Sequence, residues 1–218
     1  MKTNRKPSKQ SYFEHVRSDL VKHIPTSASR ILEIGCGAGA TANAIRNQRS
    51  KELTLVGVEI DPEAAERATK IFNKVIVGPV DDALESLKIH EFDVILYGDV
   101  LEHLVNPWQT VKEHAKLLSM DGKIIASIPN IAYFKVIQML KRGEWTYEDA
   151  GIMDRTHLRF FTRSTMIDLF HEADLDVMVV DKVWGGNKVK RSLMRLLPKR
   201  FSDRYVQQFI LIAEHRRE

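Results

Sequence analysis

Short apolar runs alternate with segments of helical periodicity through the first 130 residues of the chain. The apolar runs are four to seven residues long, as expected for strands buried on both faces. The runs cover residues 30–34, 53–59, 74–77, 92–97 and 122–128, and the helical segments cover 39–49, 62–72, 81–87 and 107–118. This order predicts an α/β fold of three layers, in which helices cover both faces of a mostly parallel sheet.

The N-terminal part follows a different pattern. Residues 1–10 are basic and polar, and residues 11–24 place apolar side chains at helical spacing before Pro25 ends the segment. We therefore treat 1–27 as an N-terminal tail and helix and 28–218 as one domain. The tail has no apolar stretch behind it, so no signal peptide is expected.

The C-terminal part contains two insertions. Residues 131–163 carry aromatics and charges without clear periodicity, which predicts a lid or substrate-binding insertion. Residues 175–184 and 205–213 are β-rich and enclose a basic helical insertion at 186–204. The two final strands are expected to form an antiparallel hairpin at the edge of the sheet.

Three glycines with regular spacing, Gly35, Gly37 and Gly39, follow the first strand in the run ILEIGCGAGA. They predict a tight turn that lets the backbone approach a ligand beneath the start of a helix. Cys36 is the only cysteine and fills this turn, so disulfides and cysteine-based metal sites are excluded and a reducing cytoplasm is favoured. The glycine spacing alone also fits a dinucleotide-binding turn, which leaves nicotinamide and flavin cofactors as alternatives.

Two acidic residues narrow the choice of ligand. Glu59 ends the second strand, where a carboxylate can accept hydrogen bonds from a ribose diol. Glu33 lies within the apolar first strand, and a buried charge needs a partner. A pyrophosphate would be repelled by Glu33, whereas an ammonium group would not. The pair therefore favours a nucleoside cofactor that ends in a cationic amino acid.

The chain resembles the class I S-adenosylmethionine-dependent methyltransferases. LEIGCGAG resembles their first motif, VGVEID the acidic end of their second strand, and FDVILYGDVLEHLVNPW their fourth-strand region. SIPN and RTHLRFF resemble a bacterial branch associated with polysaccharide and other small-molecule biosynthesis. The resemblance implies a Rossmann-like sheet of seven strands with an antiparallel last strand. It also implies S-adenosylmethionine as cofactor and S-adenosylhomocysteine as product.

The resemblance places cofactor contacts at the ends of four strands. Pro79 stands where an acid is frequent in the family, so either of two following acids is a candidate for the adenine. The implied contacts are Glu33, Gly35 and Gly37 for the methionine, Glu59 for the ribose, Val80 with Asp81 or Asp82 for the adenine, and Gly98, Asp99 and Val100 beside the methionine and the methyl group, with Cys36, Gly39 and Ile60 as further cofactor contacts.

A hydroxyl acceptor also needs a base. His157 is a candidate general base, with Asp154 three residues before it to orient the imidazole. His103 is a second candidate, although it equally fits a capping or packing role. No metal ligand is expected.

The insertion supplies candidate acceptor contacts. Arg159 could hold an anionic group or pair with an acid to close the lid. Tyr133, Trp145 and Tyr147 could form an aromatic platform for a sugar or another ring, although such residues also serve as core. The predicted reaction is methyl transfer to a hydroxyl of a sugar, glycan precursor or similar small molecule, with transfer to nitrogen or carbon as the alternative.

The positive charge lies at the ends of the chain. The net charge is +4, and the stretch KVKRSLMRLLPKR is amphipathic, so residues 188–200 could contact a membrane surface or dock on the body of the protein. No nucleic acid is expected as a partner, although a binding or scaffold protein on this fold is a further alternative. The sequence does not predict the oligomeric state.

Overall fold

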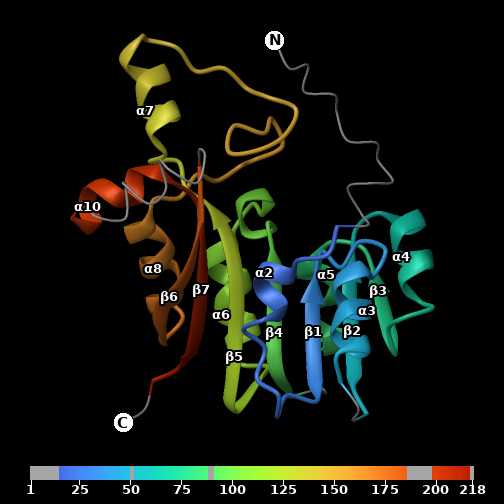
Figure 1. The fold of residues 1–218 in the computed structure, drawn as a ribbon. Coiled ribbons are helices and arrows are strands. Elements are labelled where there is room, and N and C mark those ends of the chain that lie inside the picture. Colours follow the sequence, from blue (N-terminus) through green and yellow to red (C-terminus); the bar gives the residue numbers. More distant parts are fainter. Residues whose placement is uncertain (1–14, 50–51, 88–90, 186–197, 217–218) are drawn as a thin grey trace.

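A single seven-stranded sheet forms the centre of the computed structural model, which describes residues 15–49, 52–87, 91–185 and 198–216. The strand order is β3-β2-β1-β4-β5-β7-β6 (Figure 1). The first five strands run parallel, and β7 is antiparallel to both of its neighbours. The strands are β1 Arg30–Ile34, β2 Thr54–Glu59, β3 Lys74–Val77, β4 Phe92–Gly98, β5 Leu118–Pro129, β6 Leu175–Trp184 and β7 Val206–His215.

Helices cover both faces of the sheet, as the alternation of elements predicts. Successive strand residues point to opposite faces, so Ile31 packs in one apolar cluster and Leu32 in the other. The first cluster includes residues of α2 Ser18–Val21, α3 Ala40–Asn47 and α4 Pro62–Ala68. The second includes residues of α5 Val80–Leu87, α6 Pro107–Ala115 and α8 Arg163–His171.

Local signals set the starts of several helices. The Asp61 carboxylate accepts hydrogen bonds from the backbone N–H groups of Glu63 and Ala64, and Pro62 occupies the first turn of α4. Asn106 caps α6 in the same way, and Thr162 forms a capping box with Thr165 at α8. These caps explain why the helix starts fall within one residue or so of the expected positions.

The end of the chain forms the expected antiparallel hairpin at the edge of the sheet. Its strand β7 lies between β5 and β6, so β6 is the outer strand at this edge. Most of the expected basic insertion, residues 186–197, lies outside the described residues, as do residues 1–14 of the tail. The described part of that region forms α10 Lys199–Ser202 and the 3₁₀ turn η2 Asp203–Tyr205.

The segment that follows β5 stands above the carboxyl ends of the strands (Figure 1). It contains α7 Phe134–Lys141 and a long loop that returns to the sheet through a bridge between Asn130 and Phe161. Tyr133, Val136 and Met153 form a small buried cluster inside it. Among the described residues, no helix is both long and apolar enough to cross a bilayer.

A buried polar pair lies in the core between β4 and α6. The Tyr97 hydroxyl and Nδ1 of His114 form a short hydrogen bond, and both side chains are almost fully buried. Burial lowers the pKa of His114 to about 4, because the imidazolium would lose its hydration. The histidine is therefore neutral in the folded protein at pH 7.

This pair should make folding stability depend on pH. The unfolded chain binds a proton at His114 below about pH 6.5, whereas the folded chain resists it down to about pH 4. The free energy of unfolding should therefore fall by about 2 kcal/mol between about pH 7 and pH 5 on account of this residue. Urea unfolding of the wild type and His114→Gln at both values measures the difference. Equal losses in the two proteins would mean that the His114 pKa is ordinary.

Candidate functional site

The glycine turn after β1 is built so that only glycine fits. Gly35, Gly37 and Gly39 all have positive φ angles, of 68°, 54° and 86°. A Cβ atom on Gly35 would lie 2.7 Å from a methyl carbon of Val100. The turn closes against β2, because the N–H groups of Gly35 and Cys36 donate to the Val58 carbonyl oxygen. The backbone is thereby exposed to a ligand at the carboxyl end of the sheet.

Cys36 has the structural role that its position indicates. Its side chain is buried, and its sulfur occupies the space where a Cβ atom on Gly57 would otherwise lie. Burial and two nearby carboxylates raise the pKa of its thiol, so the thiol is not activated as a nucleophile.

Glu59 at the end of β2 stabilises the same turn by hydrogen bonds. Its carboxylate accepts hydrogen bonds from the N–H of Gly37 at 2.7 Å and from the N–H of Asp61 at 2.9 Å. The side chain is buried, and it lies at the loop where the parallel sheet offers a binding crevice. This position suits a carboxylate that holds a ribose diol.

Glu33 lies under the turn with one carboxylate oxygen unpaired. Its Oε2 atom has no hydrogen-bond partner among the described residues, and the side chain is buried. Burial raises the pKa of Glu33 to about 8, and the nearby Glu59 adds to the rise, while Thr41 and Arg17 oppose it. A buried acid of this kind would be stabilised by a bound ammonium group.

Arg17, which the sequence pattern does not single out, crosses the end of β4. Its Nη1 atom donates to Asp99 Oδ2 at 2.6 Å, and its Nε and Nη2 atoms donate to Asp19. Gly98 makes room for it, since a Cβ atom there would lie 3.3 Å from Nη1. Arg17 is therefore a positive charge placed among acids at the methionine end of the proposed pocket.

Asp99 is held in an uncommon backbone conformation at the end of β4. Its φ angle is 57°, which few residues other than glycine adopt. Its second carboxylate oxygen accepts hydrogen bonds from Ser127 of β5 and Gln208 of β7. Three segments thus fix this acid beside Gly98 and Val100, where the resemblance places the methyl group.

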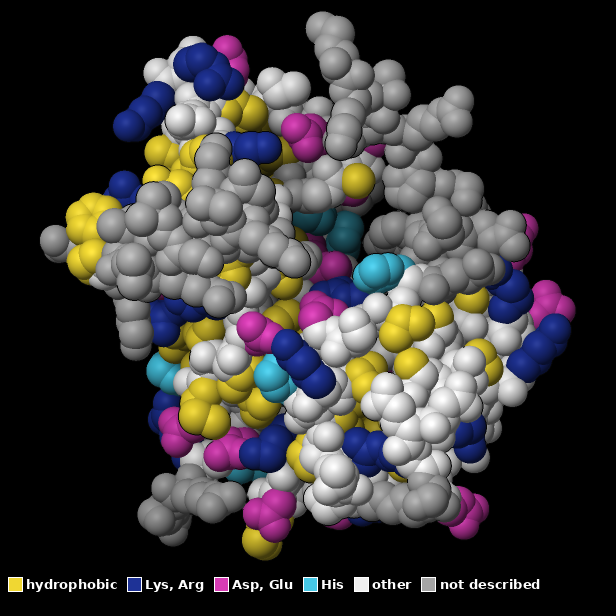
Figure 2. Space-filling model, in the orientation of Figure 1, with side chains coloured by type: hydrophobic (Ala, Val, Ile, Leu, Met, Phe, Trp, Pro, Cys, Tyr) yellow, Lys and Arg dark blue, Asp and Glu magenta, His cyan; other side chains and the backbone are white. Residues whose placement is uncertain are grey.

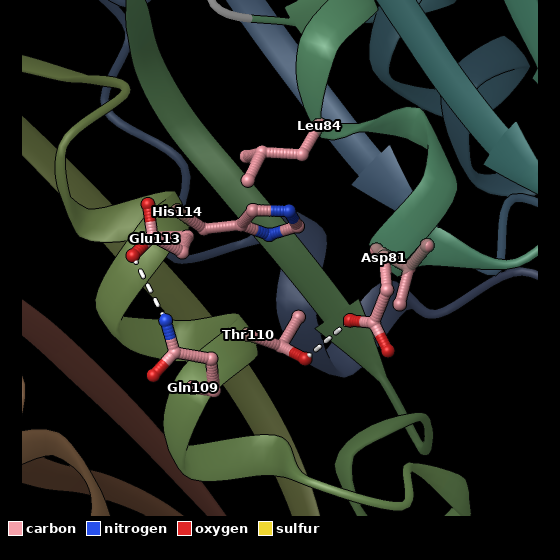
Figure 3. A pocket seen from close by; sticks show the side chains of 7 residues that line it. Asp81, Leu84, Gln109, Thr110, Glu113 and His114 are labelled. Carbon is pink, nitrogen blue, oxygen red and sulfur yellow. Dashed lines mark hydrogen bonds between the residues drawn. The ribbon is translucent and has the colours of Figure 1, made fainter.

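The remaining expected cofactor contacts lie after β2 and at the start of α5. Ile60 is 69% exposed after β2, whereas Val80 is buried at the start of α5. Asp81 accepts a hydrogen bond from the Thr110 hydroxyl of α6, so its carboxylate points between the two helices (Figure 3). There it lines a pocket of about 280 Å³ together with His114 and other residues of α6. Asp82 is exposed, and the contact of either acid with an adenine amino group stays a prediction.

The catalytic candidates are gathered by the turn after β4. Glu102 and His103 lie in the 3₁₀ turn η1 Leu101–His103, and the insertion brings His157 against them. The two imidazole rings meet edge to face with centroids 4.7 Å apart. His157 Nε2 lies 3.9 Å from the Glu102 carboxylate. Glu102 has no distinct sequence signal, because in DVLEHL it has the position of an ordinary polar helix residue.

Asp154 does not have the expected role of orienting His157. Its carboxylate accepts from the N–H and the hydroxyl of Thr156, at 2.8 and 2.6 Å. His157 is oriented instead by the Ile152 carbonyl oxygen, 3.1 Å from Nδ1. The spacing in the sequence suggested a carboxylate and imidazole pair, but a tight turn at Asp154 satisfies the acid locally.

The expected acceptor contacts are only partly available. Tyr133 is buried in the cluster of the insertion, so it is core and not a platform. The guanidinium of Arg159 hydrogen bonds to the Val105 carbonyl oxygen and lies over the Trp108 ring. These contacts favour a role in closing the lid over a role in binding an anionic group of the acceptor. Trp145 and Tyr147 are partly exposed and contact each other edge to face, so part of their surface is accessible to an acceptor.

The face of the molecule above the strand ends is hollowed. Figure 2 shows histidine and acidic side chains inside this hollow, with basic side chains beside them. The hollow lies below the insertion and above the sheet, where the glycine turn and the η1 turn meet. This is the place at which open parallel α/β sheets bind their ligands.

Comparison with known proteins agrees with this geometry. A family model described as a methyltransferase domain matches residues 9–180. An uncharacterized protein of Methanocaldococcus jannaschii, MJ1123, is 34% identical over 136 residues, which cover 62% of this chain and 61% of that protein. The ubiquinone biosynthesis O-methyltransferase of Xylella fastidiosa strain 9a5c is 28% identical over 150 residues, which cover 62% and 60%. The chain thus spans about 60% of the length of these curated relatives.

A solved structure shows the same fold. The crystal structure of a SAM-dependent methyltransferase from Archaeoglobus fulgidus superimposes with a TM-score of 0.62 at 18% identity, covering 89% of this chain and 90% of that one. The fold is that of the class I S-adenosylmethionine-dependent methyltransferases. Because the family model spans most of the chain, the protein belongs to the methyltransferase-domain family.

Binding of S-adenosylmethionine should release a proton from Glu33. The free protein holds Glu33 protonated at pH 7, and a bound ammonium group would favour its carboxylate. We expect close to one proton released at about pH 7, and an affinity that rises up to about tenfold per pH unit below pH 8. Calorimetry in buffers of different ionisation enthalpy measures both, and Glu33→Gln should abolish both. A wild-type affinity that is flat with pH would contradict this role.

The ribose role of Glu59 predicts a loss of cofactor affinity. Glu59→Ala removes a charged acceptor of two hydrogen bonds, which should weaken S-adenosylmethionine binding about 10- to 100-fold. Glu66→Ala on the exposed side of α4 is the matched control and should bind as the wild type does. Thermal unfolding of both variants separates a binding effect from a loss of the hydrogen bond to Gly37. Unchanged affinity in a folded Glu59→Ala protein would exclude the ribose role.

Proposed function

We propose that the protein transfers the methyl group of S-adenosylmethionine to a hydroxyl of a small, ring-bearing acceptor such as a sugar or glycan precursor. The observation that carries this proposal is the cluster of Glu102, His103 and His157 beside Asp99, at the end of β4. Methyl transfer from a sulfonium needs no activation of the donor, so the protein must align and deprotonate the acceptor. A cluster with two imidazoles at this place suits a hydroxyl, whose proton must leave.

The donor side of the proposal depends on charge. The methionine part of the donor carries an ammonium and a carboxylate, and its sulfonium adds a second positive charge. Glu33 offers an unpaired oxygen to the ammonium, and Arg17 offers a guanidinium near the carboxylate. Asp99 and Glu102 lie on the side where the sulfonium would be placed.

The acceptor side depends on the insertion. Trp145 lies with its ring centroid 5.3 Å from that of Phe160, and both belong to the segment that brings His157 to the strand ends. Exposed aromatic faces near a catalytic cluster favour a ring-bearing acceptor. The curated relative named for ubiquinone biosynthesis is an O-methyltransferase by its name, which supports transfer to oxygen. A chain with a single cysteine forms no internal disulfide, which suits a reducing compartment, so the proposed location is the cytoplasm.

An acceptor panel tests the reaction. The full chain is incubated with S-adenosylmethionine and matched acceptors that carry either hydroxyl or amine groups on sugar and phenol rings. We expect S-adenosylhomocysteine and an O-methyl product, detected by mass spectrometry, with hydroxyl acceptors alone. Turnover confined to the amines would exclude transfer to oxygen.

A variant of His157 separates chemistry from donor binding in the same assay. His157→Ala should leave S-adenosylmethionine affinity intact and lower turnover about 100-fold or more, because the hydroxyl then keeps its proton. His171→Ala, an exposed histidine of α8, is the control and should turn over as the wild type does. Equal turnover of the two variants would remove His157 from the reaction.

A further inference from the structure

Three potential ligand atoms converge beside the proposed methyl-transfer site. Glu102, His103 and His157 each offer one such atom, and these atoms lie within 4.8 Å of one another. They come from two segments, the η1 turn and the insertion, so the cluster exists only in the folded chain. Its residues are buried or half-buried at the hollow above the sheet.

The hydrogen bonds of the two histidines fix their tautomers. His103 Nδ1 lies 3.2 Å from the Thr156 carbonyl oxygen, and His157 Nδ1 lies 3.1 Å from the Ile152 carbonyl oxygen. A carbonyl oxygen only accepts, so each Nδ1 carries the proton and each Nε2 keeps a free lone pair. A backbone carbonyl that orients an imidazole in this way is the usual arrangement around metal-binding histidines.

Glu102 is buried without a partner for its charge. Its side chain is 1% exposed, and neither carboxylate oxygen has a hydrogen-bond partner within the part of the chain that the structure describes. Asp99 next to it is already bound by Arg17, Ser127 and Gln208. A buried carboxylate of this kind costs several kcal/mol unless a cation neutralises it. Among the described residues, His157 Nε2 at 3.9 Å is its ion-pair candidate, and the Arg17 charge acts on it from a longer distance.

We propose that Glu102, His103 and His157 bind a divalent transition-metal ion. Two imidazole nitrogens and one carboxylate oxygen suit ions such as Mn²⁺, Co²⁺ or Zn²⁺ better than Mg²⁺ or Ca²⁺, which prefer oxygen ligands alone. Metal–ligand bonds of about 2.1 Å require ligand atoms about 3 to 3.4 Å apart. The three ligand atoms, which lie within 4.8 Å of one another, would therefore move closer together by side-chain rotation when the ion binds. Three protein ligands leave coordination positions open to another molecule.

The open positions explain why the site lies at the end of β4. In this respect alone the inference rests on the proposed function, because the acceptor hydroxyl would bind to the ion. A bound ion would replace His157 as the group that activates the acceptor, because His157 would then be a ligand and not the base. It would lower the pKa of that hydroxyl, whose proton would leave to solvent. The resulting oxyanion forms a bond to the methyl carbon, and the carbon–sulfur bond breaks with its electron pair returning to sulfur. The products are the methyl ether and S-adenosylhomocysteine.

Direct metal binding tests the site without donor or acceptor. The full chain is treated with a chelator, dialysed, and titrated with MnCl₂, CoCl₂, ZnCl₂ and MgCl₂ by calorimetry, and the visible absorption of bound Co²⁺ is recorded. We expect one transition-metal ion per chain, weaker binding of Mg²⁺, and a rise in melting temperature with metal concentration. Glu102→Gln and His157→Ala should each weaken binding at least tenfold, whereas His171→Ala should bind as the wild type does.

Two results would overturn the inference. One is a wild type that binds none of the three transition-metal ions, and the other is a bound ion whose affinity and Co²⁺ spectrum do not change in the two ligand variants. Melting of the metal-free variants shows that they fold, and His103→Ala is a third ligand variant if one of them does not. Because no methyl transfer is measured, a negative result here leaves the proposed reaction standing. Failure of the acceptor panel leaves metal binding standing in the same way.

Discussion

Acidic side chains concentrated at neighbouring strand ends are the constraint that organises this molecule. Glu33, Glu59, Asp99 and Glu102 all lie at or next to the carboxyl ends of β1, β2 and β4, and three of them are buried. Arg17 is the cation that the described residues place among them. Burial raises the pKa of Glu33 and of Glu102, and the nearby carboxylates of Glu59 and Asp99 add to these two rises. The fold therefore maintains a charge imbalance that bound cations would relieve.

The imbalance is sustained because the rest of the domain is well packed. Two apolar clusters, one on each face of the sheet, hold the strands in register, and the strand ends are fixed by backbone hydrogen bonds such as those from the glycine turn to Val58. Arg17 joins the N-terminal segment to β4 and so closes one side of the hollow. The energy that burial supplies in the core offsets the cost of the acids above it. The methyl donor and the proposed metal ion would each neutralise part of this charge.

The fold could be predicted from the sequence because its signals are local and repeated. Apolar strands, capped helices and the glycine turn each specify their own segment, and parallel connectivity then places Glu33 and Glu59 at the same edge. Three features could not be predicted in this way. Arg17 has no periodic signal, Asp81 points to α6 because of the rotation of α5, and the contact of Glu102 with His157 depends on how a long insertion folds back.

The insertion is attached to the η1 turn by backbone hydrogen bonds as well as by side-chain contacts. The N–H groups of Leu158 and Arg159 both donate to the Glu102 carbonyl oxygen, and Asn130 bridges to Phe161 at the other end. These bonds do not depend on residue type, so the tip between α7 and Asp154 can change in sequence or length while His157 keeps its place. Descendants of such a domain could thus acquire new acceptors by exchanging the tip alone, with the chemical step inherited unchanged.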